Sequence, residues 1–82
     1  MTEVEGRILK IVRRLSDTPD LAVSPAESLF ESGILDSFGL TDLVAALELE
    51  FGIQIPDSDL RPANFSSIQA INQYLESRTG GA

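Results

Sequence analysis

The sequence predicts an all-α fold, a small four-helix bundle with three longer helices, one short third helix and a long loop between helices one and two. Apolar residues recur at helical intervals in three segments, and Ser/Thr-x-x-Glu/Gln capping boxes open two of them. Strand-like alternation is confined to Ile53-Gln54-Ile55, which Pro56 follows directly. The 82 residues have the length of one domain, which we place at 1–82.

The first segment predicts an amphipathic helix over residues 3–15. Thr2 and Glu5 have the spacing of a capping box at its start. The apolar positions form one stripe along the helix: Val4, Ile8, Ile11, Val12 and Leu15. We expect this stripe to be buried and the basic residues of the segment to lie in solvent.

Residues 16–36 form a long connection, which Pro19 and Pro25 keep free of periodic structure. Loops of this length in compact domains are either functional or disordered. Disorder is disfavoured by six large apolar residues: Leu21, Val23, Leu29, Phe30, Ile34 and Leu35. We therefore expect a loop fixed onto the core, with one short turn near 25–30 and an unusual backbone conformation at Gly33.

A second helix is predicted over 37–51, ending at Gly52. Its core face consists of Leu40, Leu43, Val44, Leu47 and Phe51. Its outward face consists of Phe38, Thr41, Asp42, Ala45 and Leu49, with Glu48 at the margin. Two large apolar residues on that face are unexpected. Either Phe38 folds back onto the loop and Leu49 is an isolated exposed leucine, or the two form a docking patch.

The remaining chain predicts a short helix over 57–61, ended by Pro62. Its acidic residues lack the glycine and closing glutamate of a calcium loop, so no metal site is expected there. A second capping box, from Ser66 to Gln69, begins a helix over 67–77. We expect a flexible tail at 79–82.

The residue types present exclude most catalytic chemistry. With no Cys and no His, the chain lacks thiolate metal sites and the commonest general base. The carboxylate pairs Asp57 with Asp59 and Glu48 with Glu50 are two residues apart, and such side chains point apart on a helix. We therefore expect that the protein is not an enzyme.

The charges are unevenly distributed along the chain. The net charge is -7, and between Leu15 and Leu60 there are ten acidic residues and no Lys or Arg. This distribution argues against nucleic acid as a partner and favours basic protein surfaces. The sequence has no secretory signal and no apolar run near the roughly 20 residues of a membrane span. We expect a cytoplasmic monomer that does not insert into membranes.

Ser37 lies where the loop ends and the second helix begins. A phosphodiester on its hydroxyl would lie beside the free amide groups and the positive dipole end of that helix. Serine is also a common N-cap residue. Local chemistry alone therefore leaves both a modification site and a simple cap open.

Three stretches of the chain together resemble a known family. They are Gly33-Ile34-Leu35-Asp36-Ser37-Phe38, the helix from Leu40 to Phe51, and Gly52-Ile53-Gln54-Ile55-Pro56-Asp57. The chain looks like the acyl carrier protein family, the phosphopantetheine-binding carrier domains, of the discrete stand-alone type. The similarity extends to Leu29-Phe30 and to Asn64-Phe65-Ser66-Ser67-Ile68.

This resemblance implies that Ser37 receives 4'-phosphopantetheine from coenzyme A through a magnesium-dependent phosphopantetheinyl transferase. The thiol of this arm would hold an acyl or aminoacyl group as a thioester. The implied partners are an acyl- or aminoacyl-activating enzyme and acyltransferases or synthases. The implied partner-binding face on the second helix consists of Asp36, Phe38, Thr41, Asp42, Ala45, Glu48 and Leu49.

Phe38, Gly39 and Leu49 stand where many fatty-acid carriers have leucine or acidic residues. Asp-Ser-Phe resembles D-alanyl carriers and some stand-alone carriers of polyketide or nonribosomal peptide pathways. We expect an acyl carrier protein of a specialised polyketide, nonribosomal peptide or modified acyl pathway. An aminoacyl or D-alanyl carrier is the alternative within the family. A helical interaction module without a prosthetic group is the alternative from another class.

Overall fold

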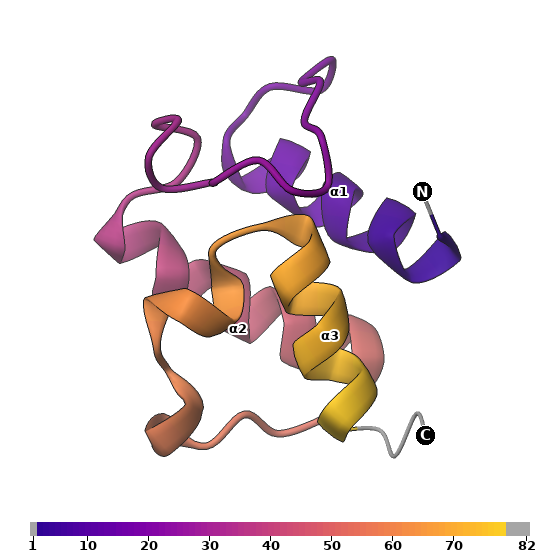
Figure 1. The fold of residues 1–82 in the computed structure, drawn as a ribbon, viewed down its shortest axis with the longest axis vertical. Helices are drawn as coiled ribbons and strands as arrows, with labels where there is room; N and C mark the ends of the chain where they lie inside the picture. Colours follow the sequence, from indigo (N-terminus) through magenta and orange to yellow (C-terminus); the bar gives the residue numbers. More distant parts are fainter. Residues whose placement is uncertain (1, 79–82) are drawn as a thin grey trace.

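The computed structural model describes residues 2–78, apart from the side chains of Ser37 and Phe38. This part of the chain contains helices α1 (Glu3–Leu15), α2 (Ser37–Phe51) and α3 (Ile68–Arg78) and no strand. Two 3-10 turns, η1 (Asp57–Asp59) and η2 (Pro62–Phe65), lie between α2 and α3. In Figure 1, α3 lies in front of α2, and the long connection that follows α1 loops over the top of the molecule. The all-α prediction is confirmed.

Helix α1 begins and ends where the apolar period predicts. The capping box forms in both directions: Thr2 Oγ1 accepts the Glu5 N–H at 3.1 Å, and Glu5 Oε1 accepts the Thr2 N–H at 2.9 Å. Of the predicted stripe, Ile8, Ile11 and Val12 are buried, while the two end residues are only half-buried. Leu9 is also buried, which widens the core face beyond the predicted stripe.

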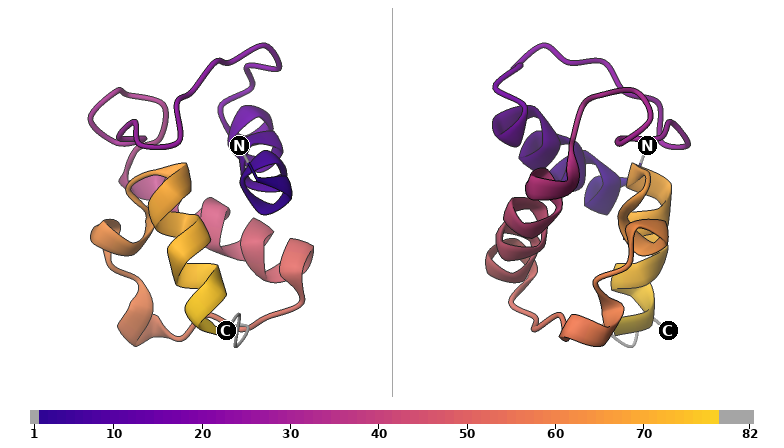
Figure 2. Two further views of the ribbon diagram at one scale, coloured as in Figure 1. Left: turned by 45° about the vertical axis from the view of Figure 1, so that its right-hand side comes forward. Right: turned by 90° about the vertical axis from the view of Figure 1, so that its left-hand side faces the viewer.

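The connection at 16–36 is fixed to the core, as expected. The Leu29 N–H donates to the Ser66 carbonyl at 2.7 Å, and the Gln69 N–H donates to the Pro25 carbonyl at 2.8 Å. Val23 and Leu29 are buried among the helices. Figure 2 shows the connection passing over one end of the helices in two further views.

The short helix predicted over 57–61 is wrong as an α-helix. The structure has two 3-10 turns there, and η1 closes with the Leu60 N–H donating to the Asp57 carbonyl at 3.1 Å. Arg61 is extended at φ -111° and ψ 135°. Proline disfavours helical backbone in the residue before it, so Pro62 stops η1 and begins η2. The described residues thus form three α-helices with 3-10 turns rather than four helices.

Helix α3 differs from its prediction by one residue at each end. Ser67 Oγ accepts the Ala70 N–H at 3.0 Å, so Ser67 caps the helix and the predicted capping box from Ser66 to Gln69 is wrong. Residues Ile68 to Arg78 are helical. The flexible tail predicted at 79–82 lies outside the described residues.

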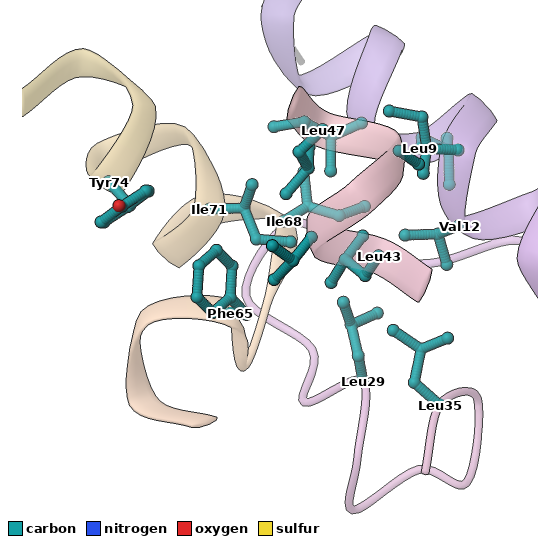
Figure 3. Close-up of a cluster of buried hydrophobic side chains, with 14 of the residues drawn as sticks. Leu9, Val12, Leu29, Leu35, Leu43, Leu47, Phe65, Ile68, Ile71 and Tyr74 are labelled. Carbon is teal, nitrogen blue, oxygen red and sulfur yellow. The ribbon is translucent and has the colours of Figure 1, made fainter. Parts of the chain in front are cut away.

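The core lies between the three helices and the connection (Figure 3). The largest side chains with almost no exposed surface are Phe65, Ile8, Leu29, Leu43, Leu47, Ile68, Ile71 and Val12. Phe65 and Tyr74 pack with ring centroids 5.2 Å apart at 57°. Each helix therefore buries an apolar face against the same cluster, which fixes the position of α2.

Two polar contacts join elements at the edge of this core. Tyr74 Oη donates to Asp59 Oδ2 at 2.7 Å and ties η1 to α3. Burial, and then the bond to Asp59, raise the pKa of Tyr74 to about 12. The Arg7 guanidinium lies 4.4 Å from the Phe51 ring centroid and pairs with Glu50 at 2.8 Å, which joins α1 to the end of α2.

Candidate functional site

The start of α2 is capped by Asp36. Its backbone is extended, its Oδ1 accepts the Gly39 N–H at 2.8 Å, and its carbonyl accepts the Leu40 N–H at 3.3 Å. Ser37 is therefore the first residue of the helix. The possibility that Ser37 itself serves as the N-cap is wrong, because Asp36 fills that position.

The chain reaches this cap through a tight turn held on the core. Gly33 has φ +79°, the left-handed conformation expected of it, and its N–H donates to the Phe30 carbonyl at 3.1 Å. The Leu35 N–H donates to the Leu29 carbonyl at 2.8 Å. The side chain of Leu35 is 6% exposed and points toward Leu43 of α2 in Figure 3. These contacts determine where α2 begins.

Gly39 allows the first turn of α2 to pack tightly on this segment. A Cβ atom at Gly39 would lie 3.3 Å from Leu35 Cδ2 and 3.5 Å from Asp36 Oδ1. Both neighbours belong to the segment that delivers Ser37 to the helix. A side chain here would crowd Leu35 and would touch Asp36 at ordinary van der Waals distance, which sequence pattern alone does not reveal.

Two pockets flank the start of α2. One, of about 490 Å³, is mainly apolar and is lined by Phe30, Gly33, Leu35, Asp36, Leu40 and Pro62. The other, of about 340 Å³, is lined by Leu15, Gly33, Ile34, Leu35, Asp36, Gly39 and Asp42. Both include Asp36, the residue directly before Ser37. Two concave surfaces, one of them suited to apolar atoms, thus adjoin the residue that precedes α2.

The helix start also suits an anion. The first amide groups of a helix have no acceptor within it, and the helix dipole is positive at this end. The Gly39 N–H already donates to Asp36. The amides of the two residues before Gly39 are therefore the ones that have no acceptor within the helix and can donate to an anion. A phosphodiester on a hydroxyl at position 37 fits this environment. The Asp36 carboxylate is exposed, so solvent screens its repulsion of that charge.

The outward face predicted for α2 is exposed at its described positions apart from Glu48 at the margin. Thr41, Asp42 and Ala45 are exposed, and Leu49 is 87% exposed. The side chain of Phe38 lies outside the description, so the question whether it folds back onto the loop stays open. The exposure of this face is observed, and its role in partner binding stays a prediction.

Glu48 differs from its neighbours on that face. It is half-buried, and its Oε2 accepts the Ile55 N–H at 2.8 Å. One carboxylate oxygen thus holds the loop that leaves α2. The helical period predicts that Glu48 lies at the margin of the outward face, but it does not predict this contact. The contact depends on how the chain turns after Gly52.

The described residues contain no group of His, Cys, Asp and Glu side chains able to hold a metal ion. None of their helices is long and apolar enough to cross a bilayer.

Comparison with known proteins gives one family and several similar relatives. The family model described as "Phosphopantetheine attachment site" matches residues 6–75. "Aminoacyl carrier protein 1" of Bradyrhizobium diazoefficiens is 34% identical over 76 residues, which cover 90% of this chain and 83% of that protein.

Two further relatives have comparable similarity. "Aminoacyl carrier protein 2" of the same organism is 29% identical over 79 residues, covering 94% of this chain and 88% of the relative. "D-alanyl carrier protein" of Streptococcus pyogenes serotype M1 is 30% identical over 73 residues, covering 89% and 91%. The similarity thus spans nearly the whole of each chain.

Proposed function

The chain belongs to the phosphopantetheine-binding carrier proteins, and on that premise we propose that Ser37 is the residue that bears the 4'-phosphopantetheine arm. The observation that carries the proposal is the position of Ser37 as the first residue of α2, directly after the cap Asp36 and within the matched residues 6–75. Proteins of this family carry cargo for other enzymes and are not catalysts themselves.

The bound arm supplies a thiol that carries the cargo as a thioester. The chain's own residues present that arm. Leu35 anchors the approach to α2, and Asp36 fixes the residue at which the helix begins. The helix dipole at this end favours the negative phosphodiester. Ser37 thereby begins α2 next to Asp36, which lines two pockets.

We propose an aminoacyl group as the cargo. The relatives reported above are named aminoacyl and D-alanyl carriers. The packing between α2 and α3 supports a small cargo, because Leu43 and Leu47 of α2 and Ile68 and Ile71 of α3 all have 0% exposure. A long acyl chain would have to displace these side chains, whereas an amino acid needs no cavity between the helices.

A second cargo is favoured by one observation. The pocket of about 490 Å³ beside Asp36 is lined by apolar side chains, among them Phe30 and Leu40. Such a surface suits a short acyl or polyketide unit, as in the specialised pathways expected from the sequence. The two cargoes differ in polarity, so direct identification separates them.

The docking face of the proposal is the outward side of α2, with the residues expected from the sequence: Asp36, Phe38, Thr41, Asp42, Ala45, Glu48 and Leu49. Leu49 supplies an apolar anchor that no part of the described chain covers, and Asp42 supplies a charge for a basic partner surface. The partners are a phosphopantetheinyl transferase and an aminoacyl-activating enzyme. A monomeric state and a cytoplasmic location are parts of the same proposal.

Mass spectrometry tests the attachment residue. The apo protein is incubated with coenzyme A, magnesium and a broad-specificity transferase, and we expect the mass to rise by one phosphopantetheine. Ser37→Ala should show no gain, while the matched control Ser58→Ala, at an exposed serine, should gain like the wild type. A gain that persists in Ser37→Ala, or none in the wild type, contradicts the proposal.

The cargo is tested on protein isolated from its native host. Intact mass before and after hydroxylamine treatment gives the mass of the thioester-bound group, and chromatography of the released hydroxamate identifies it. We expect an amino acid. A released acyl hydroxamate would contradict the aminoacyl proposal and establish the second cargo.

A further inference from the structure

The outward side of α1 carries a group of basic residues separate from the face around Ser37. Arg7, Lys10, Arg13 and Arg14 lie within two turns of α1, away from the buried Ile8 and Val12. They account for four of the six basic residues in a chain with 13 acidic ones. The positive charge of this acidic protein is therefore concentrated on one helix.

Two of these residues have a partner within the chain. Arg7 is occupied by its ion pair with Glu50. Arg13 is half-buried, and its Nε donates to the Leu21 carbonyl at 2.8 Å. Lys10 and Arg14 are exposed and make no side-chain hydrogen bond or ion pair with any described residue. Their charges are available to a partner.

The surface between these side chains is concave. A pocket of about 400 Å³ is lined by Lys10, Arg13, Arg14, Asp17 and Pro19. One side of it is held in place, because Arg13 is bonded to Leu21 and the Thr18 N–H of the turn after α1 donates to the Arg13 carbonyl at 3.0 Å. Three cationic groups thus surround one hollow that holds a single carboxylate. We call this surface the α1 basic pocket.

Helix stability explains only part of this arrangement. Basic residues in a last turn complement the helix dipole, which accounts for Arg13 and Arg14. Lys10 lies farther from the helix end, and like charges four residues apart, such as Lys10 and Arg14, destabilise a helix. The dipole of α1 therefore does not account for Lys10 beside Arg14.

The end of α1, where Arg14 precedes Leu15, lies close to the start of α2. Leu15, at the end of α1, lines the same pocket of about 340 Å³ as Asp36, Gly39 and Asp42. A protein bound over Ser37 can therefore extend onto the end of α1.

We propose that the α1 basic pocket receives an acidic side-chain cluster of the partner enzyme that acts at Ser37, an inference that rests on the proposed function. Charge complementarity identifies this occupant. The pocket is small, and the chain from Leu15 to Leu60 has acidic residues and no basic ones. A polyanion long enough to leave the pocket would be repelled by the acidic surface beyond it. An acidic cluster on a protein whose remaining contacts are basic or apolar matches both faces.

The first test compares two variants with equal changes of net charge. The double variant Lys10→Gln, Arg14→Gln removes two positive charges from the pocket. The control Arg61→Glu changes the net charge by the same amount at an exposed arginine directly before η2. Both are loaded with the arm and assayed with the activating enzyme. We expect the double variant to raise KM about fivefold with unchanged kcat, and Arg61→Glu to change KM little. Equal effects of the two variants overturn the inference.

The second test uses the apo chain, so it does not depend on modification of Ser37. Amide resonances are followed by NMR during separate titrations with a hexaglutamate peptide, inorganic phosphate and phosphatidylglycerol vesicles. We expect shifts at residues 10–19 with the peptide alone, lost in the Lys10→Gln, Arg14→Gln variant. Equal shifts with phosphate or with vesicles, or no shifts with the peptide, overturn the inference. Failure of the proposed function would instead appear as a wild type that accepts no arm.

Discussion

Replacing Asp36 separates the cap of α2 from the charge that partner enzymes meet. Asp36→Ala removes the 2.8 Å bond from the Gly39 N–H and leaves that amide to solvent. Asp36→Asn keeps a side-chain oxygen in the same place, because Asn caps helices about as well as Asp. Both variants therefore lose the negative charge, but only Asp36→Ala also loses the hydrogen bond from the Gly39 N–H.

The expected magnitudes follow from this geometry. Loss of an N-cap costs about 1 kcal/mol of stability, and the charge interaction with the helix dipole at an exposed site about 0.5 kcal/mol. In a domain of this size, 1 kcal/mol lowers Tm by about 4–8 °C. We expect Asp36→Ala, which loses both, to lower Tm by about 6–12 °C and Asp36→Asn, which loses only the charge, by about 2–4 °C.

The assay is a thermal melt of the apo protein followed by circular dichroism at neutral pH, with the rate of arm transfer measured on the same samples. We expect both variants to load slowly, because both lack the charge. If Asp36→Ala melts within about 1 °C of the wild type, the cap does not stabilise α2. If Asp36→Asn loads at the wild-type rate, partners do not respond to the charge.

Three further predictions concern other parts of the fold. The pKa of Tyr74 is raised from 10.0 to about 12, so as the pH rises the unfolded chain loses its phenolic proton before the folded chain does. Tm should therefore fall between pH 10 and 12, and it should fall less in Tyr74→Phe. An equal fall of Tm in the wild type and in Tyr74→Phe over that range would contradict the raised pKa. Leu49→Glu and Asp42→Lys should each slow transfer from partner enzymes while leaving Tm nearly unchanged, and unaltered loading rates would contradict the docking face. Gly52→Ala should lower Tm by several degrees because φ is 65° there, whereas Gly6→Ala, in open space within α1, should raise it by about 2–6 °C when melts are compared.

The helices could be predicted from the sequence where one apolar period runs without interruption. In α1 and α2 the repeated apolar residues, the capping box at Thr2 and the glycine at position 52 all agree. The region near Pro62 could not be predicted as well, because its 3-10 turns depend on backbone bonds and on the extended Arg61. Local pattern also placed the cap of α3 one residue early, since Ser66 and Ser67 are chemically equivalent.

The candidate site was predictable only in part. The position of Ser37 at the start of a helix follows from the sequence, and the arm follows from the resemblance. The pockets beside it could not be predicted, because Phe30 and Pro62 meet in one, and Leu15 and Asp42 in the other, through tertiary packing. The contact of Glu48 with Ile55 depends in the same way on the turn after α2.

The bonds that join the connection to the start of α3 have a consequence for folding. Two of these bonds join residues far apart in the sequence: the Leu29 N–H donates to the Ser66 carbonyl, and the Gln69 N–H donates to the Pro25 carbonyl. Closing such a loop loses chain entropy before its contacts form, so these bonds form late in folding, after the helices. We therefore expect the connection that leads to α2 to be fixed on the core only when α3 has docked.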